Sequence, residues 1–223
     1  IPFGSNDPSA EAVRLPTVAG QFLQACYFKT TATQRKGVLL FGIEFGSDRW
    51  SCLPYCEALL AAGYDVFAYE PRNQGQSDKI PEYEPLQWLT DHEIADAQAA
   101  LAYLKNRPDH DPKRLGFFGI SKGANTGLAL MSREPIIRCG VTDGAFGMIS
   151  VMVPYMRHWV RIYNSNFLVH GILPYWFYAS IAKAGIRRVQ RKRKVRFYQL
   201  EAALRRIRQP LLMIHGAADS YIK

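Results

Sequence analysis

The sequence has little cysteine and lacks a long uninterrupted apolar run. Four cysteines are spread over 223 residues, which is too few and too scattered for a disulfide scaffold. Cys52 and Cys56 lie one helical turn apart, but no further Cys or His stands at a ligand-like spacing. We therefore expect buried thiols rather than a metal pair. No stretch reaches the roughly 18 apolar residues of a membrane-spanning helix, so none is expected.

Acidic residues are nearly absent from one stretch of the chain. Residues 183–208 contain eleven Lys or Arg and one acid, Glu201. The rest of the chain carries 17 bases and 18 acids, so the formal net charge of +9 comes from this single segment. No motif of a nucleic-acid reader accompanies the charge, and nucleic acid is not an expected partner.

What remains has the composition of a globular chain, with 48% hydrophobic residues. A hairpin is expected between Ala12 and Thr30, where short alternating runs flank Ala19-Gly20. Later apolar runs alternate with helical patterns, which indicates right-handed crossovers and a mostly parallel sheet. The expected strands are 38–41, 66–69, 115–119, 138–142 and 210–214, and the expected helices include 51–62 and 124–131.

A third helix is signalled by its start. Thr90 and Glu93 form the T-x-x-E pattern of a capping box. Apolar residues then recur on one helical face, and Pro108 ends the helix before the next strand. The residues of that face are Ile94, Ala97, Leu101 and Leu104.

The most informative motif is G-x-S-x-G at residues 119–123. It stands between the expected strand 115–119 and the expected helix 124–131, the context of a nucleophile elbow. Such a turn holds its serine in a strained backbone conformation and leaves room only for small neighbours. The sequence therefore predicts that the Ser121 hydroxyl projects from the carboxyl edge of the sheet as a nucleophile.

Three further segments, with this motif, resemble the α/β-hydrolase fold family. Residues 41–46 are similar to the family's H-G-x-x-G loop, with Phe41 in place of His, and Trp50 beyond. Residues 70–77 are similar to its D-x-R-G-x-G-x-S turn, where Asn73 replaces a glycine and tolerates positive φ. Residues 210–219 are similar to its P-x-L-x-I-H-G-x-x-D pattern. The resemblance implies an α/β-hydrolase fold, with a mostly parallel sheet.

The same resemblance implies roles for individual residues. Backbone N–H groups of Ile43 or Glu44, and of Lys122, would form the oxyanion hole. Asp219 would be the acid of the triad, with Asp143 in reserve, although either could be a turn or capping residue. The turn at 70–77 is structural in the family, so Arg72 receives no catalytic role.

The base of the triad is the difficulty. The family's order is Ser, acid, His, and no histidine follows Asp219 in this sequence. We expect the chain to be a fragment whose longer parent carries the histidine after the next strand. His158 or His170 could replace it, whereas His92 is expected to be solvated, His110 lies in a polar loop and His215 is expected to be structural.

The interval before the last strand breaks the strand–helix alternation and indicates a helical cap. We expect a hydrolase core at 1–147, the cap at 148–208 and a return to the core at 209–223. The cap is aromatic first and basic afterwards. Two interpretations stand: a lid whose aromatics line an acyl pocket, or an element that contacts an anionic membrane through 183–208.

The implied function is that of a serine hydrolase acting on a small-molecule acyl substrate, without a metal or organic cofactor. Carboxylic esters are the leading substrates, and peptidase, thioesterase and acyltransferase activities share the same machinery. A non-catalytic binding module on the same fold is the competing class. The chain begins with Ile1, so a leader could have preceded it and no compartment is predicted beyond a slight preference for the cytoplasm.

Overall fold

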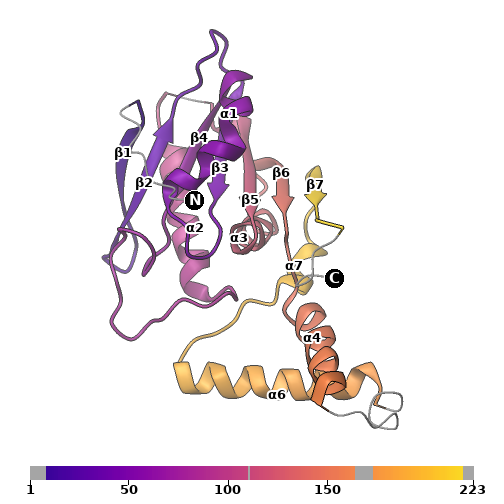
Figure 1. Cartoon of the computed structure of the whole chain (residues 1–223). Coiled ribbons are helices and arrows are strands. Elements are labelled where there is room, and N and C mark those ends of the chain that lie inside the picture. The colour runs from indigo at the N-terminus through magenta and orange to yellow at the C-terminus, as the bar shows by residue number, and fades with distance from the viewer. Residues whose placement is uncertain (1–8, 110, 164–172, 218–223) are drawn as a thin grey trace.

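The computed structural model describes residues 9–109, 111–163 and 173–217 (Figure 1). Its centre is a seven-stranded sheet of order β1-β2-β4-β3-β5-β6-β7. β2 is antiparallel to both β1 and β4, and the other neighbours are parallel. The strands are β1 Glu11–Pro16, β2 Phe22–Phe28, β3 Gly37–Gly42, β4 Tyr64–Tyr69, β5 Leu115–Ile120, β6 Ile137–Asp143 and β7 Leu211–Ile214. The expected hairpin and mostly parallel sheet are confirmed.

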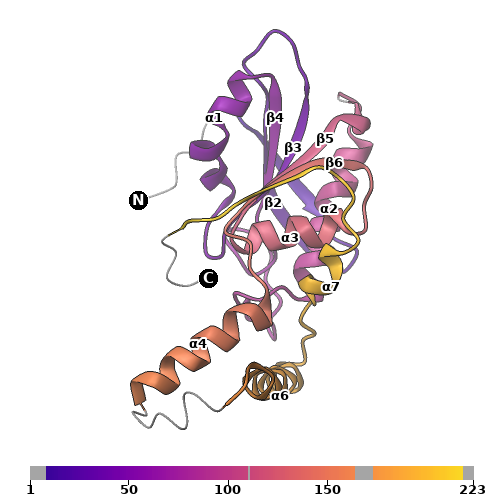
Figure 2. The same ribbon diagram turned by 90° about the vertical axis from the view of Figure 1, so that its right-hand side faces the viewer.

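Helices cover both faces of the sheet (Figure 2). α1 lies on one face, and α2 and α3 lie on the other. A 3-10 turn, Arg49–Cys52, precedes α1, so the helix begins two residues later than the sequence suggested. The described helices are α1 Leu53–Ala61, α2 Asp91–Asn106, α3 Lys122–Met131, α4 Met148–Tyr163, α6 Tyr175–Arg193 and α7 Leu200–Leu204, with a short 3-10 turn at Pro112–Arg114.

The strands of the parallel part are apolar on both faces because both faces are covered. In β3, Leu40 belongs to the core beneath α2 and α3, whereas its neighbour Phe41 belongs to the core beneath α1. Phe41 packs edge-on against Phe118 of β5, with ring centroids 5.3 Å apart. A buried phenyl ring thus occupies the position where the family pattern has a histidine.

The capping box of α2 forms as predicted. Thr90 has an extended backbone, its side chain accepts from the first turn of the helix, and Glu93 accepts from the Thr90 N–H. The predicted apolar face of α2 is buried in the core. Two carboxylates of the helix, those of Glu93 and Asp96, are buried as well, which its amphipathic pattern did not indicate.

α4 and α6 project beyond the carboxyl edge of the sheet (Figures 1 and 2). They pack on each other through a small core of Val153, Tyr178 and Ala179. α7 instead packs on the main body, where Leu200 contacts the cluster around Leu128 of α3. Among the described helices, none combines the length and the hydropathy needed to cross a bilayer.

β7 is the last strand of the sheet within the described residues, and it is poorly covered. Leu212, Met213 and Ile214 are 58%, 54% and 45% exposed. On its inner side β7 pairs in parallel with β6, with Asp143 opposite Ile214. An apolar strand is therefore open to solvent along most of its length.

Candidate active site

Ser121 occupies a strained turn between β5 and α3. Its φ of 52° and ψ of −118° lie outside the conformations that a non-glycine residue ordinarily adopts. Its N–H donates to the Asp143 carbonyl at 2.8 Å, and its own carbonyl accepts from Asn125 N–H at 3.2 Å. Both ends of the turn are thereby fixed, which holds the side chain at the carboxyl edge of the sheet.

The two glycines of the motif are required by close packing. A Cβ on Gly119 would lie 2.8 Å from Ala124 N and would also overlap the Phe117 ring. A Cβ on Gly123 would overlap the backbone of Gly42 and lie 2.5 Å from the Ile43 carbonyl oxygen. The turn at Ser121 and the loop after β3 are therefore packed backbone against backbone.

This contact brings the segments of the predicted oxyanion hole together. Ile43 is buried and Glu44 is partly exposed in the loop that Gly123 touches. Lys122 is the first residue of α3, so its N–H has no acceptor within the helix. The positive end of the helix dipole is also here, which favours negative charge beside Ser121. The role of these N–H groups stays a prediction.

The Lys122 side chain turns inward and forms a buried ion pair. Its Nζ donates to Glu93 Oε1 at 2.7 Å and to the Leu86 carbonyl at 2.6 Å. The Lys122 and Glu93 side chains are only 3% and 2% exposed. The residue after Ser121 therefore ties α3 to α2 and to the segment before α2.

Glu93 is the centre of a larger network. Besides Lys122, it accepts from Thr90 N–H at 2.8 Å, from Thr90 Oγ1 at 2.6 Å and from the Tyr83 hydroxyl. Burial opposes ionisation of Glu93, but the Lys122 charge and these donors outweigh it and hold its pKa below the ordinary value. Burial lowers the pKa of Lys122, with Glu93 opposing. With several donors aimed at one carboxylate, we take the pair as ionised at neutral pH.

The segment anchored by Lys122 also contacts the serine. Gln87 follows Leu86 and donates from Nε2 to Ser121 Oγ at 3.2 Å. The Lys122 side chain thus holds the backbone at Leu86, and the next residue, Gln87, donates to the Ser121 hydroxyl. Gln87 was not among the site residues predicted from the sequence, where Lys122 was considered only for its backbone N–H and Glu93 only for its place in the capping box. No pattern in the sequence indicates these side-chain contacts, because they join segments far apart in the chain.

The two predicted acids have different outcomes. Asp143 ends β6 and lies opposite Ile120, the residue before Ser121. Asp143 is therefore at the same sheet edge as Ser121. Burial, with the charges of Glu44 and Asp143, raises the pKa of the nearby Tyr55 hydroxyl. Asp219 lies outside the described residues.

The histidines do not gather at Ser121 in the part of the chain described. His92 was expected to be solvated, and this is wrong: its ring is half-buried, 4.5 Å from the Tyr83 ring, with Nδ1 3.4 Å from an Arg72 nitrogen. His158 lies on α4 beside Trp159. His215 follows β7 and is exposed. His110 and His170 lie outside the described residues.

The turn after β4 is held by buried ion pairs. Glu70 binds Arg49 at 2.8 Å and accepts from Gln76 N–H at 2.6 Å. Arg72 binds Asp96 of α2 at 2.5 Å. Asn73 adopts the positive φ of 62° for which its residue type is suited. These contacts tie the turn to the sheet and to α2, in keeping with a structural part for Arg72.

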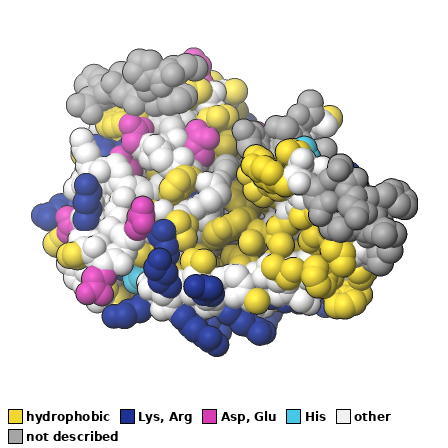
Figure 3. All heavy atoms as spheres, turned by 60° about the horizontal axis from the view of Figure 1, so that its bottom comes forward, with side chains coloured by type: hydrophobic (Ala, Val, Ile, Leu, Met, Phe, Trp, Pro, Cys, Tyr) yellow, Lys and Arg dark blue, Asp and Glu magenta, His cyan; other side chains and the backbone are white. Residues whose placement is uncertain are grey.

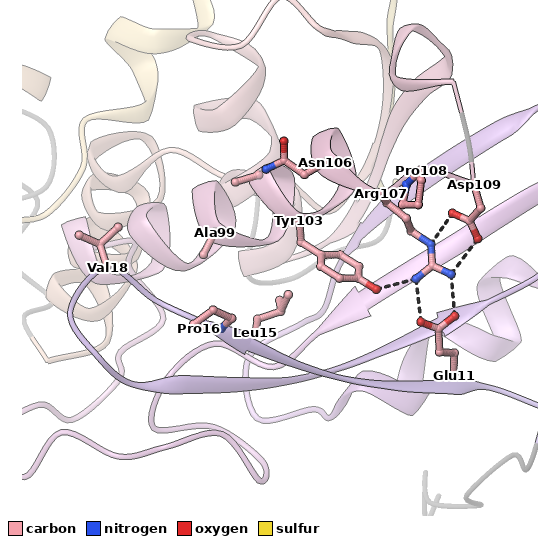
Figure 4. A pocket seen from close by; sticks show the side chains of 11 residues that line it. Glu11, Leu15, Pro16, Val18, Ala99, Tyr103, Asn106, Arg107, Pro108 and Asp109 are labelled. Carbon is pink, nitrogen blue, oxygen red and sulfur yellow. Dashed lines mark hydrogen bonds and ion pairs between the residues drawn. The ribbon is translucent and has the colours of Figure 1, made fainter.

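A separate cavity of about 690 Å³ lies between β1 and the end of α2 (Figure 4). Arg107 crosses it and binds Glu11 at 2.6 Å, Asp109 at 2.6 Å and the Tyr103 hydroxyl at 2.5 Å. Hydrogen bonds from Arg107 lower the pKa of both Glu11 and Asp109. These groups satisfy one another, and they lie at the amino edge of the sheet, away from Ser121.

Three of the four cysteines are buried, as expected for Cys52 and Cys56. Burial raises the pKa of the Cys26 and Cys56 thiols to about 12. Cys139 is exposed. Within the described residues, no group of three or more His, Cys, Asp or Glu side chains is arranged to hold a metal ion.

The sequence is similar over part of its length to two curated fungal proteins. The chain is 28% identical over 132 residues to "Thiohydrolase apmlB" of Arthrinium phaeospermum, which covers 58% of this chain and 41% of the relative. It is 33% identical over 81 residues to "Acyltransferase drtE" of Aspergillus calidoustus, covering 36% of this chain and 25% of the relative. The chain thus spans less than half the length of these curated relatives.

Similar folds occur among solved structures. An esterase of Pyrococcus furiosus, Pf2001, superposes with a TM-score of 0.66 at 23% identity, covering 96% of this chain and 72% of the esterase. The family described as "alpha/beta hydrolase fold" matches residues 38–172, which contain the Ser121 turn and the loop after β3. This match covers more than half of the sequence, and the chain therefore belongs to the alpha/beta hydrolase fold family.

Proposed function

We propose that the protein is a serine hydrolase of acyl substrates, in which Ser121 is the nucleophile. The observation that carries the proposal is the conformation of Ser121, a strained residue fixed by hydrogen bonds at both ends and backed by glycines. Strain of this kind persists where the surrounding structure enforces it, and it is concentrated at functional sites.

In the proposed reaction, Ser121 Oγ attacks the carbonyl carbon of a small carboxylic ester. The Oγ proton passes to a general base as the new C–O bond forms. The backbone N–H of Lys122, with that of Ile43 or Glu44, donates to the developing oxyanion. Collapse of the tetrahedral intermediate expels the alcohol, which takes the proton from the base. Water then attacks the acyl-enzyme and releases the acid by the same two steps.

Asp219 is the proposed acid of the triad, with Asp143 as the reserve. Its carboxylate would orient an imidazole and stabilise the imidazolium formed when Ser121 loses its proton. Asp143 has in its favour that its strand end meets the Ser121 turn through the hydrogen bond from Ser121 N–H. Alanine at each position separates the two, since only the triad acid should lower acylation by several orders of magnitude.

Thioester cleavage and acyl transfer are second candidates because two relatives are named "Thiohydrolase" and "Acyltransferase". A matched pair of an oxygen ester and a thioester of one acyl chain, each with and without an added alcohol acceptor, distinguishes these activities. A product ester in place of the free acid would identify a transferase.

A fluorophosphonate probe tests the nucleophile without knowledge of the substrate. We expect covalent labelling that Ser121→Ala abolishes and that Ser132→Ala, a change outside the site, leaves intact. Alanine variants of each of the five histidines identify the base. If labelling survives all five variants, the base lies outside these 223 residues. Absence of labelling in the native protein would favour the non-catalytic binding module instead.

A further inference from the structure

The surface formed by α4 and α6 carries aromatic side chains that packing within the chain leaves open. On α4, Tyr155, Trp159 and Tyr163 recur at every fourth residue and so share one face. The Tyr155 and Trp159 ring centroids are 5.9 Å apart, and the Trp159 and Tyr163 rings stack at 5.6 Å with an interplanar angle of 16°. All three are exposed, Tyr163 to 81%. We call these three residues the aromatic row.

The start of α6 continues the same apolar surface. Tyr175 and Trp176 are both exposed, Trp176 to 67%. A hollow of about 700 Å³ along α4 is lined in part by Trp159 and Tyr175. Figure 3 shows hydrophobic side chains gathered on one face of the molecule beside Lys and Arg side chains. A contiguous exposed group of apolar side chains, bordered by charged ones, marks an interaction surface.

The later part of α6 is strongly basic and contains no acid. Within the described residues, its one ion pair is that between Arg193 and Glu84. Arg187 and Arg191 are one helical turn apart, as are Arg188 and Lys192, and like charges at this spacing destabilise a helix. In the part of the chain that the structure describes, the α6 cations with no ion pair are Lys183, Arg187, Arg188, Arg191 and Lys192. We call these five residues the basic row.

α6 therefore combines apolar and basic surface on one exposed side. Its opposite side is occupied, because Tyr178, Ala179 and Ala182 are buried. The outward side passes from Trp176 at the start of the helix to Arg187 and Arg191 near its end. An amphipathic helix with exposed rings and uncompensated cations fits a surface that is apolar just below a layer of negative charge.

We propose that the α4–α6 surface binds the headgroup region of an anionic lipid bilayer. The basic row contacts the lipid phosphates, and the aromatic row with Trp176 enters the interface, where amphipathic rings are favoured. A second copy of the chain is a poor occupant because two basic rows would face each other. An acidic protein could form ion pairs with the basic row, but its charge would not account for the exposed tyrosine and tryptophan rings.

The surface lies at the end of the molecule that carries Ser121. α4 begins five residues after β6 ends, at the carboxyl edge of the sheet (Figure 1). Binding would bring that edge toward the bilayer. The proposal does not depend on the proposed function, because it rests on α4 and α6 alone and holds whether or not Ser121 is a nucleophile.

Flotation with vesicles tests the electrostatic half of the proposal. We expect the protein to float with phosphatidylcholine vesicles that contain phosphatidylserine, and to stay in solution with phosphatidylcholine alone. Arg187→Gln/Arg188→Gln/Arg191→Gln should lower partitioning about 100-fold, since each cation near such a surface contributes about fivefold. A matched control, Lys29→Gln/Lys105→Gln/Lys113→Gln, removes the same charge at the amino edge and should bind like the native protein.

Tryptophan quenching tests the aromatic half. Brominated acyl chains in the anionic vesicles should quench the fluorescence of Trp159 and Trp176. Trp159→Phe/Trp176→Phe retains Trp50 and Trp88 and should show little quenching while its circular dichroism is unchanged. Equal binding to neutral vesicles, no flotation, native-like binding of the arginine variant, or flotation without quenching would each overturn the proposal. If the true partner is an acidic protein, the protein should not float with any vesicle.

Discussion

Replacing Lys122 by methionine tests whether the side chain of the residue after Ser121 stabilises the site. The change keeps the length of the side chain and removes its charge, which leaves Glu93 buried without its cation. Thr90 and Tyr83 still donate to the carboxylate. The Leu86 carbonyl loses its donor as well. The predicted consequence is a large loss of stability with a distinctive pH dependence.

The magnitude can be bounded from both sides. Removing one partner of a buried ion pair costs about 3–5 kcal/mol. Glu93 can escape its unpaired charge by taking up a proton, which costs about 3.7 kcal/mol at pH 7 for a carboxyl of ordinary pKa near 4.3. The donors that remain on Glu93 favour the lower end of the range. We therefore expect Lys122→Met to lower the free energy of unfolding by about 3 kcal/mol at pH 7.

The sign of the pH dependence follows from linkage. In the native protein the pKa of Glu93 is lowered, so its contribution is present above about pH 4.3 and is lost as the pH falls through the folded-state value. In the variant, burial without Lys122 raises that pKa, so stability is highest below about pH 4.3 and falls as the pH rises. The difference in the free energy of unfolding between the native protein and Lys122→Met should therefore be smaller at pH 5 than at pH 7.

Urea unfolding at pH 7 and pH 5 measures the gap. Lys113→Met, a change at an exposed lysine, is the control and should shift stability by less than about 0.5 kcal/mol. A double variant that adds Glu93→Gln should recover about 2 kcal/mol relative to the sum of the single changes, because the two side chains are in contact. A loss under about 1 kcal/mol at pH 7, or a gap as wide at pH 5, would refute the reasoning.

Two further substitutions and one chemical titration test other parts of the structure. Gly123→Ala should cost about 3 kcal/mol in urea unfolding and abolish probe labelling, because its methyl overlaps the Gly42 backbone; native-like labelling would contradict this. Asp96→Asn should cost at least about 3 kcal/mol, since Arg72 stays charged and buried; a loss within about 0.5 kcal/mol would show that the pair is dispensable. Titration with a thiol reagent should modify Cys139 at once and the other cysteines only on unfolding, and a second fast thiol would contradict the assigned burial.

Much of the fold could be predicted because local patterns and the required packing agree. Strand 38–41 is uniformly apolar since helices cover both faces of β3. Thr90 and Glu93 mark the start of α2 through contacts three residues apart, which a sequence displays directly. The turn at Ser121 is signalled by Gly119 and Gly123, because the neighbouring backbone leaves no room for a Cβ at either position.

The surroundings of the serine could not be predicted, because they depend on contacts between distant segments. Lys122 and Glu93 are 29 residues apart, and a lysine in the elbow carries no mark of the carboxylate that it meets. Gln87 contacts Ser121 from a segment whose adjacent carbonyl, that of Leu86, accepts from Lys122. His92 was misjudged for the same reason: its charged neighbours in sequence suggested solvent, whereas Tyr83 covers its ring.

The exposed strand β7 has a practical consequence for handling the protein. An unpaired strand edge with apolar side chains is a template for pairing with another chain. The exposed side chains of β7 are apolar, namely Leu212, Met213 and Ile214. The strand contains neither Lys nor Pro, the residues that commonly protect edge strands from pairing. Among the described residues β7 pairs with β6 alone, so concentrated samples of the isolated 223-residue chain should associate through this strand. A charged residue in place of Met213 should reduce that association.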